Sequence, residues 1–136
     1  MKKESVFRQK IEKVLKSKGH FVYHIKDVPH TGTRALDIIC CIEGRFVGIE
    51  TKVIKSNSIS EQKVLKTLRA SQENAIKEII KNKGIVYIYV FWYSKYDISI
   101  THTTGRVKVY RCRIDDDGNI YLEERPNKLL PSTINL

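Results

Sequence analysis

Apolar residues recur at helical spacing in two parts of the chain, and a glycine follows each part. The first stripe lies in 4–18 and consists of Phe7, Ile11, Val14 and Leu15. The second lies in 67–83 and consists of Leu68, Ala75, Ile76, Ile79 and Ile80, with Gln72 inside the stripe. Residues three or four apart share one face of a helix, and glycine readily takes the left-handed conformation that ends one. The pattern therefore predicts two amphipathic helices, closed by Gly19 and Gly84.

Strand patterns fill most of the remaining chain. They cover 20–26, 36–42, 45–53, 85–91, 106–114 and 119–124, and a Pro-containing tail follows. Glu43-Gly44 and Asp117-Gly118 each separate two of these segments, so both predict β-hairpin turns. The run at 85–91 is apolar throughout, which is typical of a strand buried on both faces. The polar segment 55–66 fits either a mobile loop or a helix, and the pattern does not separate the two.

The order of these elements is helix, three strands, helix and strand, which predicts an α/β fold with a mixed central sheet. A strand, a helix and a strand in succession imply a parallel, right-handed crossover between 45–53 and 85–91. The chain has 136 residues, so we expect a single domain over 1–136. Its core spans about 3–91, and the hairpin at about 106–125 is appended to that core.

Asp37, Glu50 and Lys52 are the residues whose spacing indicates chemistry. Glu50 and Lys52 are two apart on one strand, so they share a face, while Thr51 points to the other face. If Glu43-Gly44 is a two-residue turn, the hairpin register places Asp37 directly opposite Glu50. Opposed residues have Cβ atoms about 4.5–5.5 Å apart. Two carboxylates at that separation can share a metal ion.

A metal ion is favoured because two carboxylates this close repel each other unless a cation lies between them. Oxygen ligands favour Mg²⁺, with Mn²⁺ as a substitute, over zinc. Such ions hold phosphate and activate water, and Lys52 on the same face would stabilise charge that builds on the phosphate. The competing interpretation is a solvated pair of acids. The Ile, Val and Cys residues around Asp37 and Glu50 weaken it, because an unpaired charge is costly to bury.

Glu4 and Gln72 lie within the stripes of the two expected helices, so both should face inward. Glu4 is a candidate third metal ligand, although the favourable interaction of an acid with a helix N-terminus explains its position equally well. Gln72 is a candidate active-site residue, since a buried amide needs a hydrogen-bonding partner. A purely structural hydrogen bond is the alternative for Gln72.

Basic residues outnumber acidic ones, 25 to 15, and the formal charge of +10 favours polyanionic partners. The residues expected to contact nucleic-acid phosphates are Arg34, Lys55, Lys63, Lys66 and Arg69. A solvated lysine-rich surface is the competing interpretation. No apolar run approaches the roughly 20 residues that cross a bilayer, so we expect a soluble, cytoplasmic protein that binds no membrane. The three cysteines lack CxxC spacing and indicate neither zinc nor disulfides.

Taken in order, these residues resemble the PD-(D/E)XK nuclease superfamily, most closely its archaeal Holliday junction resolvase and virus-type replication-repair nuclease branches. The resemblance covers roughly 3–90. Its strongest part is RALDIICCIEGRFVGIETK, at 34–52, which fits the Asp-then-Glu-x-Lys signature. RASQENAIKEIIKNKG resembles the glutamine-bearing helix that follows. Leu36 replaces the usual proline, and Gln62 is a rival to Gln72, which we prefer because its distance from Gly84 suits a single helix.

The resemblance implies a restriction-endonuclease-like αβββαβ core and divalent-metal-dependent phosphodiester hydrolysis. Asp37 and Glu50 would be metal ligands, Glu4 would match an early helix acid, and Lys52 would be catalytic. We therefore expect a magnesium-dependent endonuclease for DNA, structure-specific for branched DNA such as Holliday junctions. A homodimer is expected because resolving a junction takes two symmetric cuts. The alternatives are a non-catalytic basic DNA- or RNA-binding module and a repair or RNA-processing nuclease on the same core.

Overall fold

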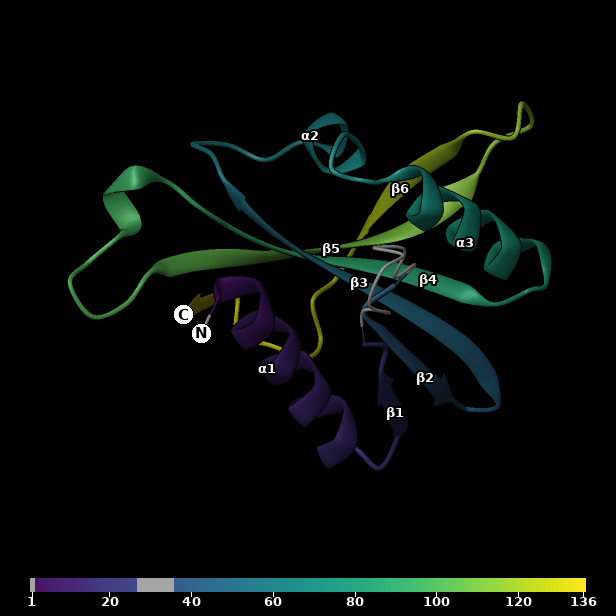
Figure 1. The fold of residues 1–136 in the computed structure, drawn as a ribbon, viewed down its shortest axis with the longest axis horizontal. Coiled ribbons are helices and arrows are strands. Elements are labelled where there is room, and N and C mark those ends of the chain that lie inside the picture. Colours follow the sequence, from purple (N-terminus) through teal and green to yellow (C-terminus); the bar gives the residue numbers. More distant parts are fainter. Residues whose placement is uncertain (1, 27–35) are drawn as a thin grey trace.

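The computed structural model describes residues 2–26 and 36–136, and within these ranges the fold is mixed α/β with one central sheet (Figure 1). The elements are α1 (Lys3–Ser17), β1 (Phe21–His24), β2 (Ile38–Ile42), β3 (Arg45–Lys55), α2 (Glu61–Leu65), α3 (Ala70–Lys81), β4 (Ile85–Tyr93), η1 (Lys95–Asp97), β5 (Thr104–Ile114), β6 (Ile120–Arg125) and β7 (Thr133–Asn135). The strands follow the order β1-β2-β3-β4-β5-β6, and β7 pairs with β5. β3 and β4 are parallel and the other pairs are antiparallel, which confirms the predicted mixed sheet.

Helices cover both faces of the sheet: α1 lies on one face, and α2 and α3 lie on the other (Figure 1). Phe7 and Ile11 of α1 are fully buried in a cluster that includes Ile49 of β3. On the opposite face, Ile76 of α3 is buried in a second cluster with Ile88 of β4. Because β3 and β4 are covered on both faces, their apolar character does not alternate in the way that a half-exposed strand requires.

The turn between β2 and β3 fixes the register of the two strands. Glu43 has φ 51° and Gly44 has φ 79°, and two central residues with positive φ suit a type I′ turn whose twist matches the strands. Ile42 therefore pairs with Arg45, as predicted, and the ladder continues to the pair Ile38–Ile49. Asp37 and Glu50 are the next residues beyond that last pair.

The second amphipathic helix begins later than the apolar stripe predicts. α3 starts at Ala70 rather than Thr67, because the Gln72 side chain accepts a hydrogen bond from the Arg69 backbone N–H (3.0 Å) and caps the first turn. Lys83, with φ 68°, takes the left-handed conformation that we expected of Gly84. Gly84 serves packing instead, since a Cβ there would lie 2.6 Å from the Ile79 side chain.

The segment that the sequence left open, 55–66, contains the short helix α2. Ser60 caps it, because its Oγ accepts a hydrogen bond from the Lys63 backbone N–H at 3.3 Å. Val64 is fully buried and anchors the helix to the sheet. The polar character of the segment reflects the exposure of most of its other residues.

The C-terminal hairpin belongs to the central sheet, because β5 pairs with β4 over most of its length. The Pro-containing tail carries a strand, β7, that the sequence did not predict. Thr103 and Leu136 exchange two backbone hydrogen bonds, of 2.7 and 2.8 Å, so the end of the chain is tied to the start of β5. The C-terminus lies near the start of α1 (Figure 1). None of the described helices is long and apolar enough to span a membrane.

Candidate metal centre

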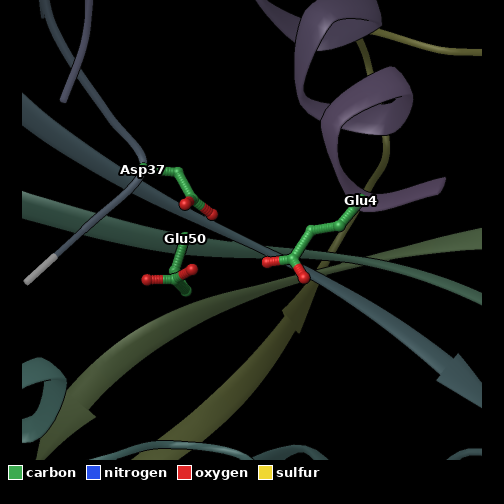
Figure 2. Close-up of side chains that lie close together, drawn as sticks. All are labelled: Glu4, Asp37 and Glu50. Carbon is green, nitrogen blue, oxygen red and sulfur yellow. The ribbon is translucent and has the colours of Figure 1, made fainter. Parts of the chain in front are cut away.

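Three carboxylates from separate elements converge where β2 begins. Glu4 lies in the first turn of α1, Asp37 immediately precedes β2, and Glu50 lies on β3. One oxygen from each lies within 4.8 Å of the others, and Figure 2 shows the three side chains pointing toward a common space. Asp37 and Glu50 are each 1% exposed, whereas Glu4 is exposed. Two buried acids and one solvent-accessible acid therefore share one small volume.

Helix packing places Glu4 at this position. Phe7 and Ile11, one and two turns further along α1, are fully buried against the sheet and hold the helix on the α1 face. Glu4 lies at the N-terminal end of the same stripe, where the helix reaches β3. The Glu4 side chain thus points toward Asp37 and Glu50, as its place in the stripe predicted, although Glu4 itself is exposed (Figure 2).

Asp37 is held by Thr51, a residue to which the sequence analysis gave no role in the site. Asp37 Oδ2 accepts hydrogen bonds from the Thr51 backbone N–H (2.8 Å) and from Thr51 Oγ1 (2.6 Å). The contact has a physical reason: strand pairing ends at Ile38, so the pleat does not dictate the direction of the Asp37 side chain, which reaches Thr51 on the face opposite to Lys52. Thr51 is fully buried. The signal that sequence reasoning missed is a hydroxyl residue between Glu50 and Lys52 in an otherwise apolar strand.

Glu50 and Lys52 are joined through Gln72 on α3. Gln72 Nε2 donates a hydrogen bond to Glu50 Oε2 at 2.9 Å, and Gln72 Oε1 accepts one from Lys52 Nζ at 3.2 Å. Lys52 Nζ also donates to the carbonyl of Thr67 at 3.2 Å. Gln72 is 2% exposed, so the prediction that it faces the sheet is confirmed, while the rival Gln62 is exposed on α2. A buried amide thus links the buried acid to the ammonium group.

The donor chemistry of the cluster fits a hard divalent cation. Its ligand atoms are carboxylate oxygens, and no His or Cys joins them among the described residues. Mg²⁺ and Mn²⁺ prefer such oxygen ligands, whereas zinc prefers nitrogen and sulfur. The negative charge of Glu50 also affects its surroundings: burial first, and then this charge, raise the pKa of the nearby Cys112 thiol to about 12.

The predicted phosphate-binding residues lie between the end of β3 and the start of α3, apart from Arg34, which is outside the described residues. Lys55 ends β3, Lys66 follows α2, and Arg69 precedes α3; all three are exposed. Lys63 is engaged within the protein, where its Nζ donates hydrogen bonds to Ser56 Oγ (2.8 Å) and to the carbonyl and hydroxyl oxygens of Ser58 (3.1 Å each). Their role in nucleic-acid binding stays a prediction.

Comparison with known proteins shows a likeness in structure but not in sequence. No protein-family model matches the chain, and no curated protein matches its sequence. Among solved structures, the chain is similar to Hjc, a Holliday junction resolvase from the archaeal hyperthermophile Archaeoglobus fulgidus. The identity is 11%, the match covers 88% of this chain and 87% of that chain, and the TM-score is 0.49. At this identity and TM-score the likeness transfers no activity, so we derive the function from the site.

Proposed function

We propose that this protein is a divalent-metal-dependent endonuclease that hydrolyses phosphodiester bonds in DNA. The observation that carries the proposal is the convergence of Glu4, Asp37 and Glu50 within 4.8 Å, with two of the three acids buried. The chain around this acidic cluster has a net charge of +10. A basic protein attracts nucleic acid, and a buried acidic cluster within it is explained by a bound cation rather than by contact with phosphate.

The acids would hold Mg²⁺, for which Mn²⁺ substitutes. Asp37 and Glu50 are the expected ligands from the sheet, and Glu4 is the expected ligand from α1. When bound, the ion supplies Lewis-acid stabilisation of phosphate oxygens and lowers the pKa of water. Thr51 contributes by holding Asp37 through two hydrogen bonds to one carboxylate oxygen. Without a cation, the three acids repel one another at a cost to stability.

Lys52 is the proposed catalytic cation. Its ammonium group has three N–H donors and, among the described residues, two acceptors: the Thr67 carbonyl and Gln72 Oε1. The third donor is available for a phosphate oxygen, where it stabilises the negative charge that develops during hydrolysis. Gln72 is a positioning residue, because it holds Lys52 and Glu50 in a fixed relation through its two ends.

We further propose branched DNA, such as a four-way junction, as the preferred substrate and a homodimer as the working form. Both rest on the resemblance of 34–52 and of the glutamine-bearing helix to the PD-(D/E)XK nucleases, among them the archaeal resolvases. Two symmetric cuts across a junction suit a closed two-fold dimer, in which each copy supplies one cluster of acids. The homodimer is testable by sedimentation at the concentrations used for cleavage.

The direct test is cleavage of labelled four-way junction, flap, single-stranded and linear duplex DNA, with a matched RNA, in Mg²⁺, Mn²⁺ or EDTA. We expect metal-dependent cleavage that Asp37→Asn and Lys52→Ala abolish. Asp116→Asn is the matched control for Asp37→Asn, because it removes the same charge from an exposed turn and should leave cleavage unchanged.

Three results would count against the proposal in different ways. Cleavage in EDTA, or full activity of Asp37→Asn, would exclude the metal-dependent mechanism. Cleavage of RNA alone would point to the RNA-processing alternative on the same core. Salt-dependent binding without any cleavage, and without a change in melting temperature on adding Mg²⁺, would identify a non-catalytic binding module.

A further inference from the structure

A polar hollow lies beyond the acid cluster, at the end of the sheet where β3 and β4 terminate. It has a volume of about 330 Å³ and is lined by Lys55, Ser56, Asn57, Ser94 and Lys95. Figure 1 shows the β3–α2 connection and the η1 loop, which supply these residues, at the same end of the sheet. Among the described residues, no acid lines the hollow. Its volume falls in the range of about 300–1,000 Å³ that is usual for small-ligand sites.

The two segments that form the hollow are joined to each other by backbone contacts. Lys55 pairs with Tyr93 in the parallel register of β3 and β4, and the Ser56 backbone N–H donates to the Tyr93 carbonyl at 2.8 Å. The sheet therefore brings Lys55 and Lys95, forty residues apart in sequence, into the lining of one cavity.

Internal hydrogen bonds hold both rims in place. On the η1 side, the backbone N–H and Oγ of Ser94 donate to Asp97 Oδ2 at 2.7 and 3.0 Å, and these bonds lower the pKa of the Asp97 carboxyl. On the other side, Lys63 Nζ donates to Ser56 Oγ at 2.8 Å and adds a third ammonium group beside the hollow. The Asp97 carboxylate is thus bound to Ser94, and the hydroxyl groups of Ser56 and Ser94 are held by hydrogen bonds.

This composition suits a phosphate group. Lys55, Asn57 and Lys95 are exposed and form a rim of donors, while Ser56 and Ser94 are half-buried. Lysine binds phosphate as a point charge, and hydroxyl and amide groups add neutral hydrogen bonds to its oxygens. Two lysines that line one hollow place positive charge on both of its supporting segments, and an anion bound there would offset that charge. The hollow therefore gains more from an anion than a single surface lysine does.

The hollow and the acid cluster are linked through β3 and the start of α1. Lys55 is five residues after Glu50 on β3, a separation of about 16 Å in an extended strand. Lys3, beside Glu4 in α1, places its Nζ 5.6 Å from the centre of the Tyr93 ring, and Tyr93 adjoins Lys55. A nucleic-acid strand whose scissile phosphate lies at the acids reaches the hollow with a phosphate a few nucleotides away.

We propose that the hollow between Lys55 and Lys95 is a phosphate-binding subsite that holds the substrate backbone away from the scissile phosphate. The identification of the bound strand as the DNA substrate rests on the proposed function. The preference for a phosphate group rests on the residues that line the hollow. The subsite supplies affinity and sets the direction of the strand through the catalytic centre, without reading sequence.

The test is the salt dependence of binding of a fluorescent four-way junction and of a duplex of equal length, measured in EDTA so that no metal-dependent cleavage occurs. Each phosphate contact contributes about 0.9 to the slope of log affinity against log salt on duplex DNA. We expect Lys55→Ala/Lys95→Ala to reduce the slope by about 2 and to weaken binding about tenfold near physiological salt. Lys55→Arg/Lys95→Arg keeps both charges and should keep the slope.

The matched control is Lys10→Ala/Lys13→Ala, which removes two lysines from a different cavity, between α1 and the C-terminal tail. It should leave the slope unchanged. Equal loss of slope in the control pair, or an unchanged slope in Lys55→Ala/Lys95→Ala, would overturn the subsite. Lys55 and Lys95 are exposed, so the variant should have the melting temperature of wild type. An equal melting temperature excludes misfolding as the cause of a changed slope.

The outcomes separate this proposal from the proposed function. An unchanged slope in Lys55→Ala/Lys95→Ala, together with loss of cleavage in Asp37→Asn, removes the subsite and keeps the nuclease. A reduced slope in a protein that cuts nothing keeps the phosphate subsite and removes the nuclease. A wild-type protein that binds neither probe at low salt contradicts both.

Discussion

The two faces of β3 bury side chains of different chemistry. On the α1 face, Ile49 is buried among apolar side chains and needs only a close fit. On the α3 face, Glu50 is equally buried, yet it carries a carboxylate that contacts Gln72. Adjacent residues with the same exposure thus have different partners: apolar side chains surround Ile49, and a hydrogen-bonding amide contacts Glu50. The difference shows that burial alone does not identify a core residue, and that the partners of a buried group decide its role.

On the α3 face of β3, the largest effect is expected from Glu50→Gln, which removes a proposed metal ligand but retains the shape of the side chain. We expect kcat/KM in Mg²⁺ to fall on the order of 10³-fold, or about 4 kcal/mol. The unfolding free energy should stay equal or rise, because repulsion with Asp37 is relieved.

Two measurements check this prediction: steady-state cleavage of the preferred DNA, and urea denaturation with and without Mg²⁺. Wild type should be stabilised by Mg²⁺, and Glu50→Gln should not. A variant that cuts within tenfold of wild type would show that Glu50 is not a ligand.

The opposite pattern is expected one residue away, for Ile49→Ala. Shortening a fully packed side chain leaves a cavity, so the unfolding free energy should fall by about 3 kcal/mol. Cleavage per folded molecule, measured well below the melting temperature, should stay close to wild type. A selective loss of activity with full stability would mean that the two faces of β3 are not functionally distinct.

Gln72→Ala tests the link between Glu50 and Lys52. Removing a group that orients catalytic side chains typically costs about 10–100-fold, and we expect a loss of this size in kcat with little change in KM. Gln62→Ala is the control, since Gln62 is the rival glutamine and is exposed on α2. Equal effects of the two substitutions would remove the positioning role of Gln72.

Thr51→Val tests the hydrogen bond between Thr51 Oγ1 and Asp37 Oδ2 while it retains the branched shape of the side chain. A hydrogen bond to a charged group contributes roughly 1.5 kcal/mol at the low end. The Mg²⁺ concentration for half-maximal cleavage should therefore rise about tenfold. Thr51→Ser keeps the hydroxyl and should recover most of the loss; if the serine variant is as weak as the valine variant, the methyl group matters and the hydrogen bond does not.

The smallest effect concerns the thiols. Burial raises the pKa of Cys40 to about 11 and, with the charge of Glu50, that of Cys112 to about 12, so both stay protonated at pH 8. A reagent that modifies accessible thiols should label Cys41 rapidly at pH 8 and the other two cysteines only on unfolding. Cys41→Ser should leave no fast-reacting thiol.

The same two thiols predict a pH dependence of stability. Because their folded pKa values lie above the unfolded value, the stability that they contribute is complete below about pH 8.5 and is lost as pH rises toward 12. Stability that rises across this range would contradict the buried environment of both thiols.

Much of the fold followed from local patterns. The Glu43-Gly44 turn fixed the register of β2 and β3 because a two-residue hairpin turn constrains the strands that it joins. The helix stripe identified Phe7 and Ile11 as buried, and it placed Gln72 on the face toward the sheet. The predicted start of α3 was wrong, because a side-chain cap from Gln72 overrides the apolar periodicity at Leu68.

Other features depend on residues that are distant in sequence. β7 is three residues long and exists because β5 offers it an open edge. The contact between Thr51 and Asp37 arises where strand pairing stops, which no periodicity records. The hollow between Lys55 and Lys95 exists because β3 and β4 end side by side.

By itself, the sequence determined that α1 and α3 are helices and that β1 to β6 are strands, and it determined the hairpin register and the proximity of Asp37 to Glu50. Each follows from apolar periodicity or from turn chemistry. The tertiary structure alone decided that Glu4 reaches this pair from α1, that Thr51 holds Asp37, and that Gln72 joins Glu50 to Lys52. The physical reason is that these contacts cross between packed layers. Their geometry is set by how helix and sheet bury their apolar faces against each other, and local spacing does not encode it.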